Sequence, residues 1–419
     1  MSNASPKTSF KGRIGALIGI LLMALSLRAA VVSVPPLLAR IQDDIEFTEF
    51  TIGLLATLAP IVFACFGLLT PRLIRAFGLE KTLISAVVLA VLGQVARVFT
   101  TDVYAFLGLS VIALAGYGMG NVVLPPLVKK YFPDRIGLVT SGYVTMLAVG
   151  TWMAPQFSVP LANASDWQIS IGSWALLSTI VLVPWIIQLL ADRKVDRPNQ
   201  PAHASAGAAG TITRINPWKS KVAWGLAIFL AGNSAQTYVY FTWLPPYLQD
   251  RGLSELSAGN MLALFAILGL PVSLLVPLWV PRLKNPIIAV LIFTACWVAG
   301  HLGIYLSPTS GTILWVCLAG LGQGTFAIAL LMMNLRSRTT YGSGVLSGFA
   351  QGLGYAGAGI VPLLFGVVQK SSGSWGPAFA MLGVCVVVML VGAIIINPSR
   401  TIEDSVPGGG KAGGLERIG

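Results

Sequence analysis

The chain has 419 residues, of which 55% are hydrophobic and only 10% are charged, and its formal net charge at pH 7 is +12. Soluble domains carry about 25% charged residues, so this composition excludes an ordinary soluble protein and indicates one that lies in lipid. The basic residues do not form one nucleic-acid-binding domain, because they are spread over the polar segments between apolar ones.

Twelve apolar stretches are long enough to cross a membrane as helices, which takes about 20 residues each. Strand patterning is absent, and an open sheet could not satisfy its backbone hydrogen bonds in lipid. The first stretch is too long for a signal peptide and has no small-residue cleavage site, so we predict a retained helix. We therefore predict an all-α membrane protein with transmembrane helices within residues 14–38, 51–70, 82–100, 104–127, 137–161, 170–191, 221–247, 257–280, 286–306, 311–334, 343–367 and 376–397.

The chain repeats itself on either side of one long polar segment, residues 192–220, whose Pro, Ala, Gly and Ser content predicts a flexible linker rather than a regulatory site. VPPLL (34–38) recurs as LPPYL (244–248), and AGYGMG (115–120) recurs as AGLGQG (319–324). Several such matches in one order indicate duplication. We predict two pseudo-symmetric six-helix bundles, the architecture of the major facilitators, with boundaries at 1–191, 192–220 for the linker, 221–397, and 398–419 for a tail.

Basic residues indicate which side of the membrane each loop faces. If the N-terminus lies inside, the inner segments hold 22 of the 27 Lys and Arg residues, and the outer loops hold only Arg40, Arg251 and Lys370. This asymmetry follows the positive-inside rule. We predict a multi-pass protein of the cytoplasmic membrane with both termini in the cytoplasm and no nucleic-acid partner.

The spans lack the groups that enzyme or metal chemistry requires. All 15 Asp and Glu residues fall in loops, at span ends or in the tail, whereas proton-driven transporters usually carry an intramembrane carboxylate. The four cysteines have neither paired spacing nor a companion His, which disfavours a disulfide frame or a metal site. The run GLGYAG (352–357) matches a dinucleotide pattern but has no preceding strand, so we interpret it as a packing face. We expect no enzyme activity, cofactor or metal.

Arg28 is the basic residue nearest the middle of a predicted span. A charge at that depth costs about 2.5–3.5 kcal/mol on insertion scales and should face the bundle interior or a wet cavity. Either helix carbonyls satisfy it, or it binds a substrate anion; we favour the anion, which suits the planar donor fork of a guanidinium. Arg97, near the outer end of the third span, is expected to reach the interface or to pair with Asp102.

The seventh span contains the most polar run, GNSAQTYVYFTWLPPYL (232–248). The repeat offset makes Tyr238 the counterpart of Arg28, so pseudo-symmetry would place both beside a central path. Asn233, Gln236 and Tyr240 stand at helical spacing on a neighbouring stripe, which could equally serve hydrogen bonds between helices. The predicted substrate-site residues are Arg28 as the charge anchor, Asn121, Asn233 and Gln236 as hydrogen-bond partners, and Tyr238, Tyr240 and Trp243 as wall and gate.

Two proline pairs, Pro35–Pro36 and Pro245–Pro246, occupy matching places in the two halves. Proline in a helix interior removes a hydrogen bond and clashes with the preceding turn, so we expect each pair to end the first helix of its half early. Such helix tips could bend as an outer gate, or they could be plain helix ends. His301, in the ninth span, is expected to be a satisfied core histidine rather than a proton relay.

Four stretches together resemble the cyanate permease and 2-nitroimidazole transporter family of the major facilitator superfamily: LRAAVVSVPPLL (27–38), GLLATLAPIVFACFGLLTPRLIRAFGLEKTL (53–83), GNVVLPPLVKKYFPDRIGLVTSGY (120–143) and TWLPPYLQDRG (242–252). The resemblance implies twelve helices, alternating access, and a small substrate that is anionic or a polar heterocycle. Arg28 lies within the family's signature. In the inner loop after the second span the family has an acid where this chain has Pro71, which puts an inner-gate salt bridge there in doubt.

We therefore predict a secondary transporter, expected to be a monomer in the lipid bilayer, for a small anion such as cyanate or a compact nitro-heterocycle. One alternative is an exporter of neutral or cationic drugs, but no intramembrane carboxylate would balance a cation. The other is a membrane sensor that does not transport, but the linker and tail are too short and too rich in Gly and Ala for a soluble domain.

Overall fold

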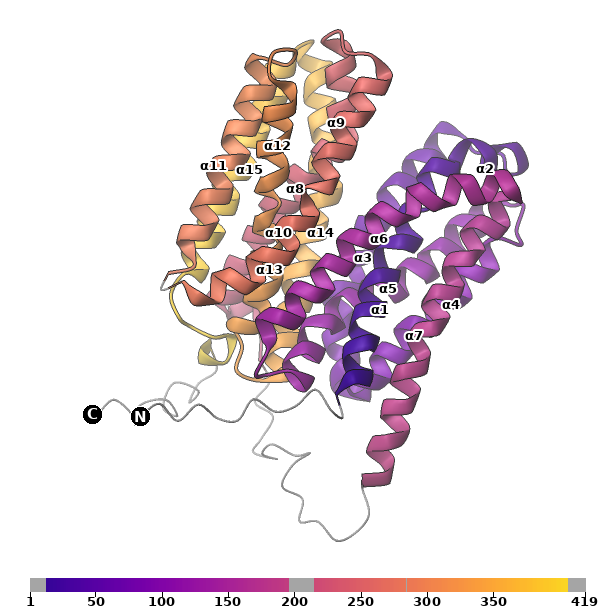
Figure 1. Ribbon diagram of the computed structural model, residues 1–419, viewed down its shortest axis with the longest axis vertical. Helices are drawn as coiled ribbons and strands as arrows, with labels where there is room; N and C mark the ends of the chain where they lie inside the picture. Colours follow the sequence, from indigo (N-terminus) through magenta and orange to yellow (C-terminus); the bar gives the residue numbers. More distant parts are fainter. Residues whose placement is uncertain (1–12, 196–214, 284, 406–419) are drawn as a thin grey trace.

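The computed structural model describes residues 13–195, 215–283 and 285–405, and the statements below concern these residues. Helices are the regular structure of this part of the chain. Ten of them are long and apolar enough to cross a membrane, and α1 and α8 complete the set of twelve crossing segments (Figure 1). The predicted all-α fold with twelve transmembrane helices is confirmed.

Two groups of helices follow each other along the chain. The first group consists of α1 (Ile14–Val32), α2 (Leu38–Asp44), α3 (Glu49–Phe77), α4 (Leu79–Arg97), α5 (Val103–Tyr131), α6 (Ile136–Ala164) and α7 (Trp167–Val195). The second group consists of α8 (Lys221–Asp250), α9 (Glu255–Ile267), α10 (Gly269–Trp279), α11 (Ile287–Leu306), α12 (Thr312–Gly322), α13 (Gly324–Leu335), α14 (Thr340–Ser372) and α15 (Trp375–Ile396). Short 3-10 turns lie at Pro35–Leu37, Pro217–Lys219, Val280–Arg282 and Ile402–Ser405.

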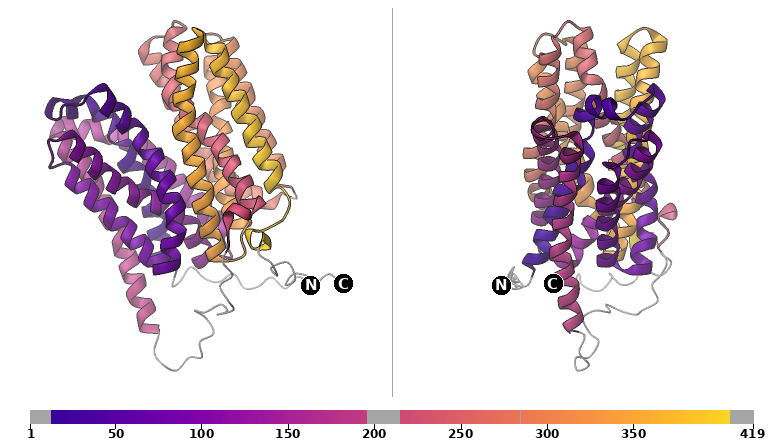
Figure 2. Two further views of the ribbon diagram at one scale, coloured as in Figure 1. Left: turned by 180° about the vertical axis from the view of Figure 1, so that it is seen from behind. Right: turned by 90° about the vertical axis from the view of Figure 1, so that its right-hand side faces the viewer.

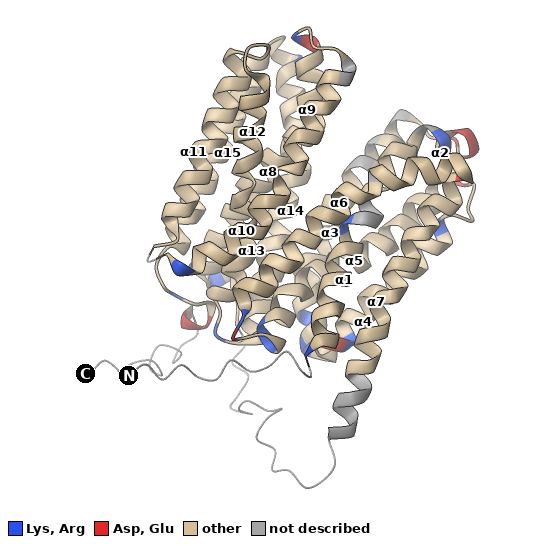
Figure 3. Ribbon diagram, viewed as in Figure 1, with Lys and Arg blue, Asp and Glu red and all other residues tan. Residues whose placement is uncertain are grey.

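The two groups form two bundles that lie side by side. They are close together at the end where α7 ends and α8 begins, which we call the linker end, and they diverge toward the opposite, far end (Figures 1 and 2). Lys and Arg gather mostly at the linker end, and Asp and Glu of the described residues lie at the two ends (Figure 3). No carboxylate of the described residues therefore lies at mid-height.

Small residues allow the bundles to touch where they are closest. An ideal Cβ on Gly67 of α3 would lie 2.7 Å from the Cα of Gly352 on α14. One turn away, a Cβ on Gly348 would lie 2.3 Å from the Cγ of Pro71 and 2.5 Å from the carbonyl oxygen of Gly67. Backbone approach of this kind is how helices associate in lipid, where burial of apolar surface gives little driving force. Pro71 thus packs against α14.

The proline pairs do not behave alike, and the expectation for the second pair is wrong. The first helix ends at Val32, and Pro35 opens a 3-10 turn, as expected. Pro245 and Pro246, however, lie inside α8, which continues to Asp250. Tertiary contacts hold this last part of α8, because the Tyr247 hydroxyl donates to the carbonyl of Ile304 over 3.0 Å.

Two predicted spans are kinked where the sequence predicted continuous helices. Leu268 separates α9 from α10, and Gln323 separates α12 from α13; both keep right-handed helical dihedral angles. The Gln323 side-chain amide donates to the carbonyl of Phe265 over 2.6 Å. The two kinks are therefore adjacent, and each crossing segment remains one span.

Two glycines on neighbouring helices provide a matched test of this packing. A Cβ on Gly93 of α4 would lie 2.4 Å from the backbone nitrogen of Ala113 on α5, whereas a Cβ on Gly108 of α5 meets nothing within 4 Å. We expect Gly93→Ala to lower the melting temperature of the purified protein, because overpacking costs about 1–3 kcal/mol. Gly108→Ala is the control and should not lower it, because alanine favours a helix. Equal melting temperatures for the two variants would contradict the close approach of α4 and α5.

Candidate functional site

Arg28 lies in the last turns of α1 and reaches the other bundle. Its Nη2 donates to the hydroxyl of Tyr355 on α14 over 3.3 Å, and the hydroxyl of Tyr238 on α8 is a second neighbour of the guanidinium. Tyr238 and Tyr355 both lie near the middle of long helices, α8 and α14. The three residues therefore form a polar contact between the bundles at mid-height, and none of the ion pairs among the described residues includes Arg28.

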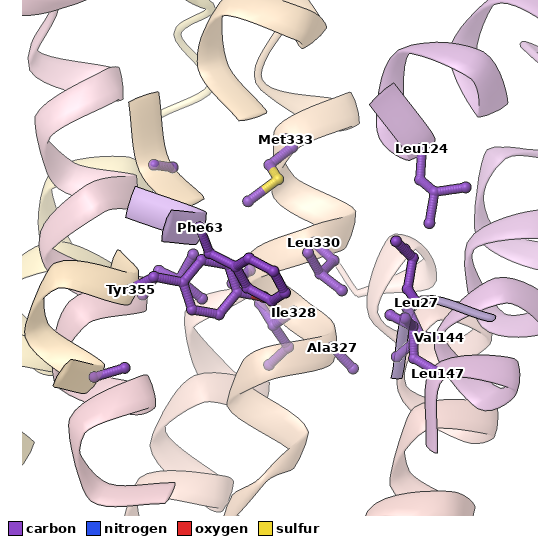
Figure 4. Packing of buried hydrophobic residues seen from close by; sticks show 14 of the residues in the cluster. Leu27, Phe63, Leu124, Val144, Leu147, Ala327, Ile328, Leu330, Met333 and Tyr355 are labelled. Carbon is purple, nitrogen blue, oxygen red and sulfur yellow. The ribbon is translucent and has the colours of Figure 1, made fainter. Parts of the chain in front are cut away.

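Apolar side chains lie next to the Tyr355 side of this polar contact. Phe63 of α3 packs edge-to-face on Tyr355, with the ring centroids 5.3 Å apart. Figure 4 shows Phe63 and Tyr355 side by side, with labelled residues of α13 between this pair and the labelled residues of α1, α5 and α6. The buried apolar residues of this layer are Leu27, Leu124, Val144 and Leu147 from the first bundle and Ala327, Leu330 and Met333 from α13. A guanidinium and two hydroxyls thus form a compact polar group in an apolar setting.

Asn121 lies near this group but makes other contacts. Its side-chain amide donates to the carbonyl of Tyr117 in its own helix over 3.3 Å. Its backbone carbonyl accepts a hydrogen bond from Gln351 of α14 over 3.0 Å, which is a second polar contact between the bundles. Gln351 lies one turn before Tyr355, so the two contacts are neighbours along α14.

Tyr355 is the residue that sequence reasoning missed. It lies in the run GLGYAG (352–357), which we interpreted as a packing face, and this interpretation holds for Gly352, whose Cβ would meet α3. The available signal was a tyrosine in a span whose other residues, apart from Gln351, are small or apolar. The repeat could not find it, because the repeat pairs Arg28 with Tyr238 only.

Three further predicted residues, Asn233, Gln236 and Tyr240, make their side-chain hydrogen bonds within the second bundle and not with Arg28. The Asn233 Oδ1 accepts from the Thr325 hydroxyl over 2.6 Å. The Gln236 Oε1 and the Tyr240 hydroxyl flank His301, at 2.9 Å from Nε2 and 2.7 Å from Nδ1. The Gln236 amide nitrogen already donates to a backbone carbonyl, so His301 Nε2 is the donor to Gln236 and Nδ1 accepts from Tyr240.

This pattern satisfies a neutral imidazole completely, as expected of a core histidine. The predicted polar stripe therefore binds α8 to α11 and α13, which fixes the helix that carries Tyr238. Trp243 serves the same helix, since its indole nitrogen donates to the carbonyl of Pro362 over 2.9 Å and its ring packs near Phe365.

Arg97 does not lie where we expected it. It is only 4% exposed, and its Nη1 lies 3.5 Å from the Ser110 hydroxyl. Asp102, the expected partner, instead caps α5 by accepting from the backbone nitrogen of Ala105 over 2.7 Å. Arg97 Nε and Nη2 have no hydrogen-bond partner among the described residues. The expectation of pairing or interfacial exposure is therefore wrong, because α4 ends with this side chain turned toward α5.

Comparison with known proteins agrees with this architecture. The family model described as Major Facilitator Superfamily matches residues 16–362. The 2-nitroimidazole transporter of Escherichia coli (strain K12) is 30% identical over 402 residues, which cover 95% of this chain and 99% of that protein. The cyanate transport protein CynX of the same organism is 23% identical over 386 residues, 92% of this chain and 97% of that protein.

Solved structures share the fold. The proton:xylose symporter XylE, bound to 6-bromo-6-deoxy-D-glucose, superposes with a TM-score of 0.71 at 14% identity, covering 94% of this chain and 98% of that chain. The transporter FucP, in the outward conformation, superposes with a TM-score of 0.63 at 16% identity, covering 91% of this chain and 99% of that chain.

The burial of Arg97 predicts an unusual response to mutation. Replacing even a buried ion pair by apolar residues of similar volume is often neutral or stabilising by about 1–4 kcal/mol, and none of the ion pairs among the described residues includes Arg97. We expect Arg97→Met to unfold at the same or a higher temperature than the unmodified protein in a thermal melt. Arg97→Ala, which leaves a cavity, should be less stable than Arg97→Met. A clear loss of stability in Arg97→Met would show that the guanidinium contributes net stability.

Proposed function

The chain belongs to the major facilitator superfamily, and from this premise we propose that it is a secondary transporter of a small anion, such as cyanate, or of a compact nitro-heterocycle. The observation that carries the proposal is the contact of Arg28, in the first bundle, with Tyr238 and Tyr355, which both lie in the second bundle. A substrate held there would touch both bundles at once, which is what alternating access around a central site requires.

The chemistry of these groups favours a substrate with acceptor atoms. A guanidinium has donors only, and a phenolic hydroxyl can donate as well as accept. Cyanate is an anion, and the oxygens of a nitro group accept hydrogen bonds. Both compounds could therefore accept from the guanidinium N–H groups of Arg28 that now donate to Tyr355. The absence of carboxylates at mid-height in the described part of the chain disfavours cationic substrates. The names of the two relatives point to the same pair of compounds.

We further propose that the linker end faces the cytoplasm of the cell, because Lys and Arg gather there (Figure 3) and the positive-inside rule applies to short loops. The bundles would then be closed toward the cytoplasm and separated toward the outside. In this arrangement Asn121, Asn233, Gln236 and Tyr240 act as positioning residues around the helices that carry the anchor.

The remaining predicted residues receive modified roles in this proposal. Pro35 and Pro36, which are exposed after the end of α1, would form a helix tip that bends at the outer gate. Pro245 and Pro246 lie within α8, so they would bend that helix rather than end it. Trp243 would form part of the wall next to α14.

Arg28 is tested by ligand-induced stabilisation, since a ligand that binds the folded state raises its melting temperature. Purified protein is screened against cyanate, nitrate, small carboxylates and nitroimidazoles. We expect Arg28→Ala to abolish the shift produced by the ligand that binds, Arg28→Lys to keep part of it, and Tyr355→Phe to weaken binding about tenfold. Arg97→Met is the matched control, because it removes a buried arginine of the same bundle and should keep the full shift. An unchanged shift in Arg28→Ala would refute the anchor.

The absence of mid-height carboxylates predicts how transport is driven. In proteoliposomes we expect substrate uptake at the same rate with and without an imposed pH gradient. His301 is the remaining titratable candidate among the polar side chains of the second bundle, and its two nitrogens are already hydrogen-bonded. Strong acceleration by a pH gradient would contradict this expectation, and its loss in His301→Gln would identify the imidazole as the proton carrier.

A further inference from the structure

The last described residues of the chain fold back onto the loop between α13 and α14, residues 336–339. The backbone nitrogen of Ile402 donates to the carbonyl of Arg336 over 2.9 Å, and the Ile402 side chain is fully buried. In return, Arg336 Nη2 donates to the carbonyl of Asn397 over 2.9 Å. The turn Ile402–Ser405, which we call the tail turn, is therefore a built contact.

Glu403 of the tail turn holds the beginning of α14. Its Oε2 accepts from the backbone nitrogen of Arg338, and its Oε1 accepts from the nitrogen and hydroxyl of Thr339, over 2.8–2.9 Å. Thr339 is the N-cap residue of α14 and accepts from the nitrogen of Gly342 over 2.9 Å. A carboxylate is stabilised there by the free backbone donors and the positive end of the helix dipole. Asp404 adds an ion pair with Arg338.

The same loop is contacted from the other bundle by Lys129, near the end of α5. Its ammonium donates to the carbonyl of Asn334 over 2.8 Å and also to the carbonyl and hydroxyl of Ser337. These are carbonyls at the C-terminal end of α13, where a cation is favoured. Lys129 therefore caps a helix of the opposite bundle at the linker end.

The closure at the linker end uses uncharged acceptors. Besides Lys129, Arg75 of α3 donates to the hydroxyl of Tyr341 on α14, and the Ser141 hydroxyl of α6 donates to the carbonyl of Leu274 on α10. Each of the ion pairs that the described residues form with one another lies within a single bundle. Glu403 also lies close enough to Lys129 for electrostatic attraction, so the tail turn can hold Lys129 both through the acceptor loop and through this carboxylate.

We infer that Lys129 is the gate contact that keeps the linker end closed, and that Glu403 and Ile402 are positioning residues that hold its acceptor loop in reach. This inference rests on the alternation of the two bundles in the proposed function. Without the tail turn the loop loses three hydrogen bonds at the start of α14, and the carbonyls that Lys129 binds are no longer fixed. The linker end then opens more easily.

The test measures the opening directly, independently of any substrate. In a variant with the four native cysteines replaced, spin labels are attached at Phe77→Cys, at the exposed end of α3, and at Lys219→Cys, exposed before α8. Pulsed electron resonance on the full chain in lipid nanodiscs gives the distance distribution between the bundles at the linker end. The compared variants are Glu403→Gln, Ile402→Ala, Lys129→Gln and the double variant Lys129→Gln with Glu403→Gln.

We expect each single variant to raise the ratio of long to short distances, by about tenfold for Glu403→Gln because it weakens hydrogen bonds to a charged group. The double variant should open no further than Lys129→Gln alone, since both residues act through one loop. Asp43→Asn, which removes an exposed carboxylate at the far end, is the control and should change nothing.

An unchanged distribution in Glu403→Gln and Ile402→Ala, or additive effects in the double variant, would overturn the role of the tail turn. An unchanged distribution in Lys129→Gln would overturn the gate contact itself. Failure of every ligand to bind would count against the proposed substrate and would leave these distance measurements unaffected.

Discussion

The guanidinium of Arg28 requires partners, because a charge at mid-height in lipid is costly unless polar atoms surround it. Its own bundle does not supply them among the contacts described; the hydroxyls of Tyr355 and Tyr238 come from the other bundle. The arginine can be stable there only while the bundles stay close at that level, or while something else replaces the hydroxyls. The same guanidinium can therefore be satisfied in two ways. In one state it binds the tyrosine hydroxyls of the other bundle, and in the proposed second state it binds an acceptor atom of the substrate.

The sequence predicted the parts of this arrangement that depend on composition and duplication. Twelve long apolar stretches without strand patterning predict helices in lipid. The internal repeat paired Tyr238 with Arg28, and the structure has the Tyr238 hydroxyl as a neighbour of that guanidinium. Rules based on local sequence gave wrong predictions where tertiary contacts determine the local structure. The rule that proline ends a helix holds after Val32, where the chain turns at the surface, but not at Pro245 and Pro246, because contacts of Tyr247 with α11 keep α8 in place.

Spacing along a helix tells which residues share a face but not what that face meets. The stripe of Asn233, Gln236 and Tyr240 was predicted correctly as a stripe, and it meets His301 and Thr325 inside its own bundle. The separation of Arg97 and Asp102 along the chain did not predict where Arg97 lies, because the Asp102 carboxylate caps α5 instead of pairing with Arg97. Tyr355 required knowledge of which helix faces α1, and no local pattern contains that information.

One helix, α14, connects the contacts at the linker end with the Arg28 contact at mid-height. Its first turn is held by Glu403, its glycines lie against α3, and Tyr355 near its middle touches Arg28. The part of α14 between its first turn and Tyr355 is continuous helix without proline, so a shift at its beginning changes the position of Tyr355 as well. Opening of the linker end and loss of the Arg28–Tyr355 contact are then expected together. A substrate that accepts hydrogen bonds from both the guanidinium and the Tyr355 hydroxyl would replace their direct contact, so binding at mid-height and release of the tail turn would favour the same conformation.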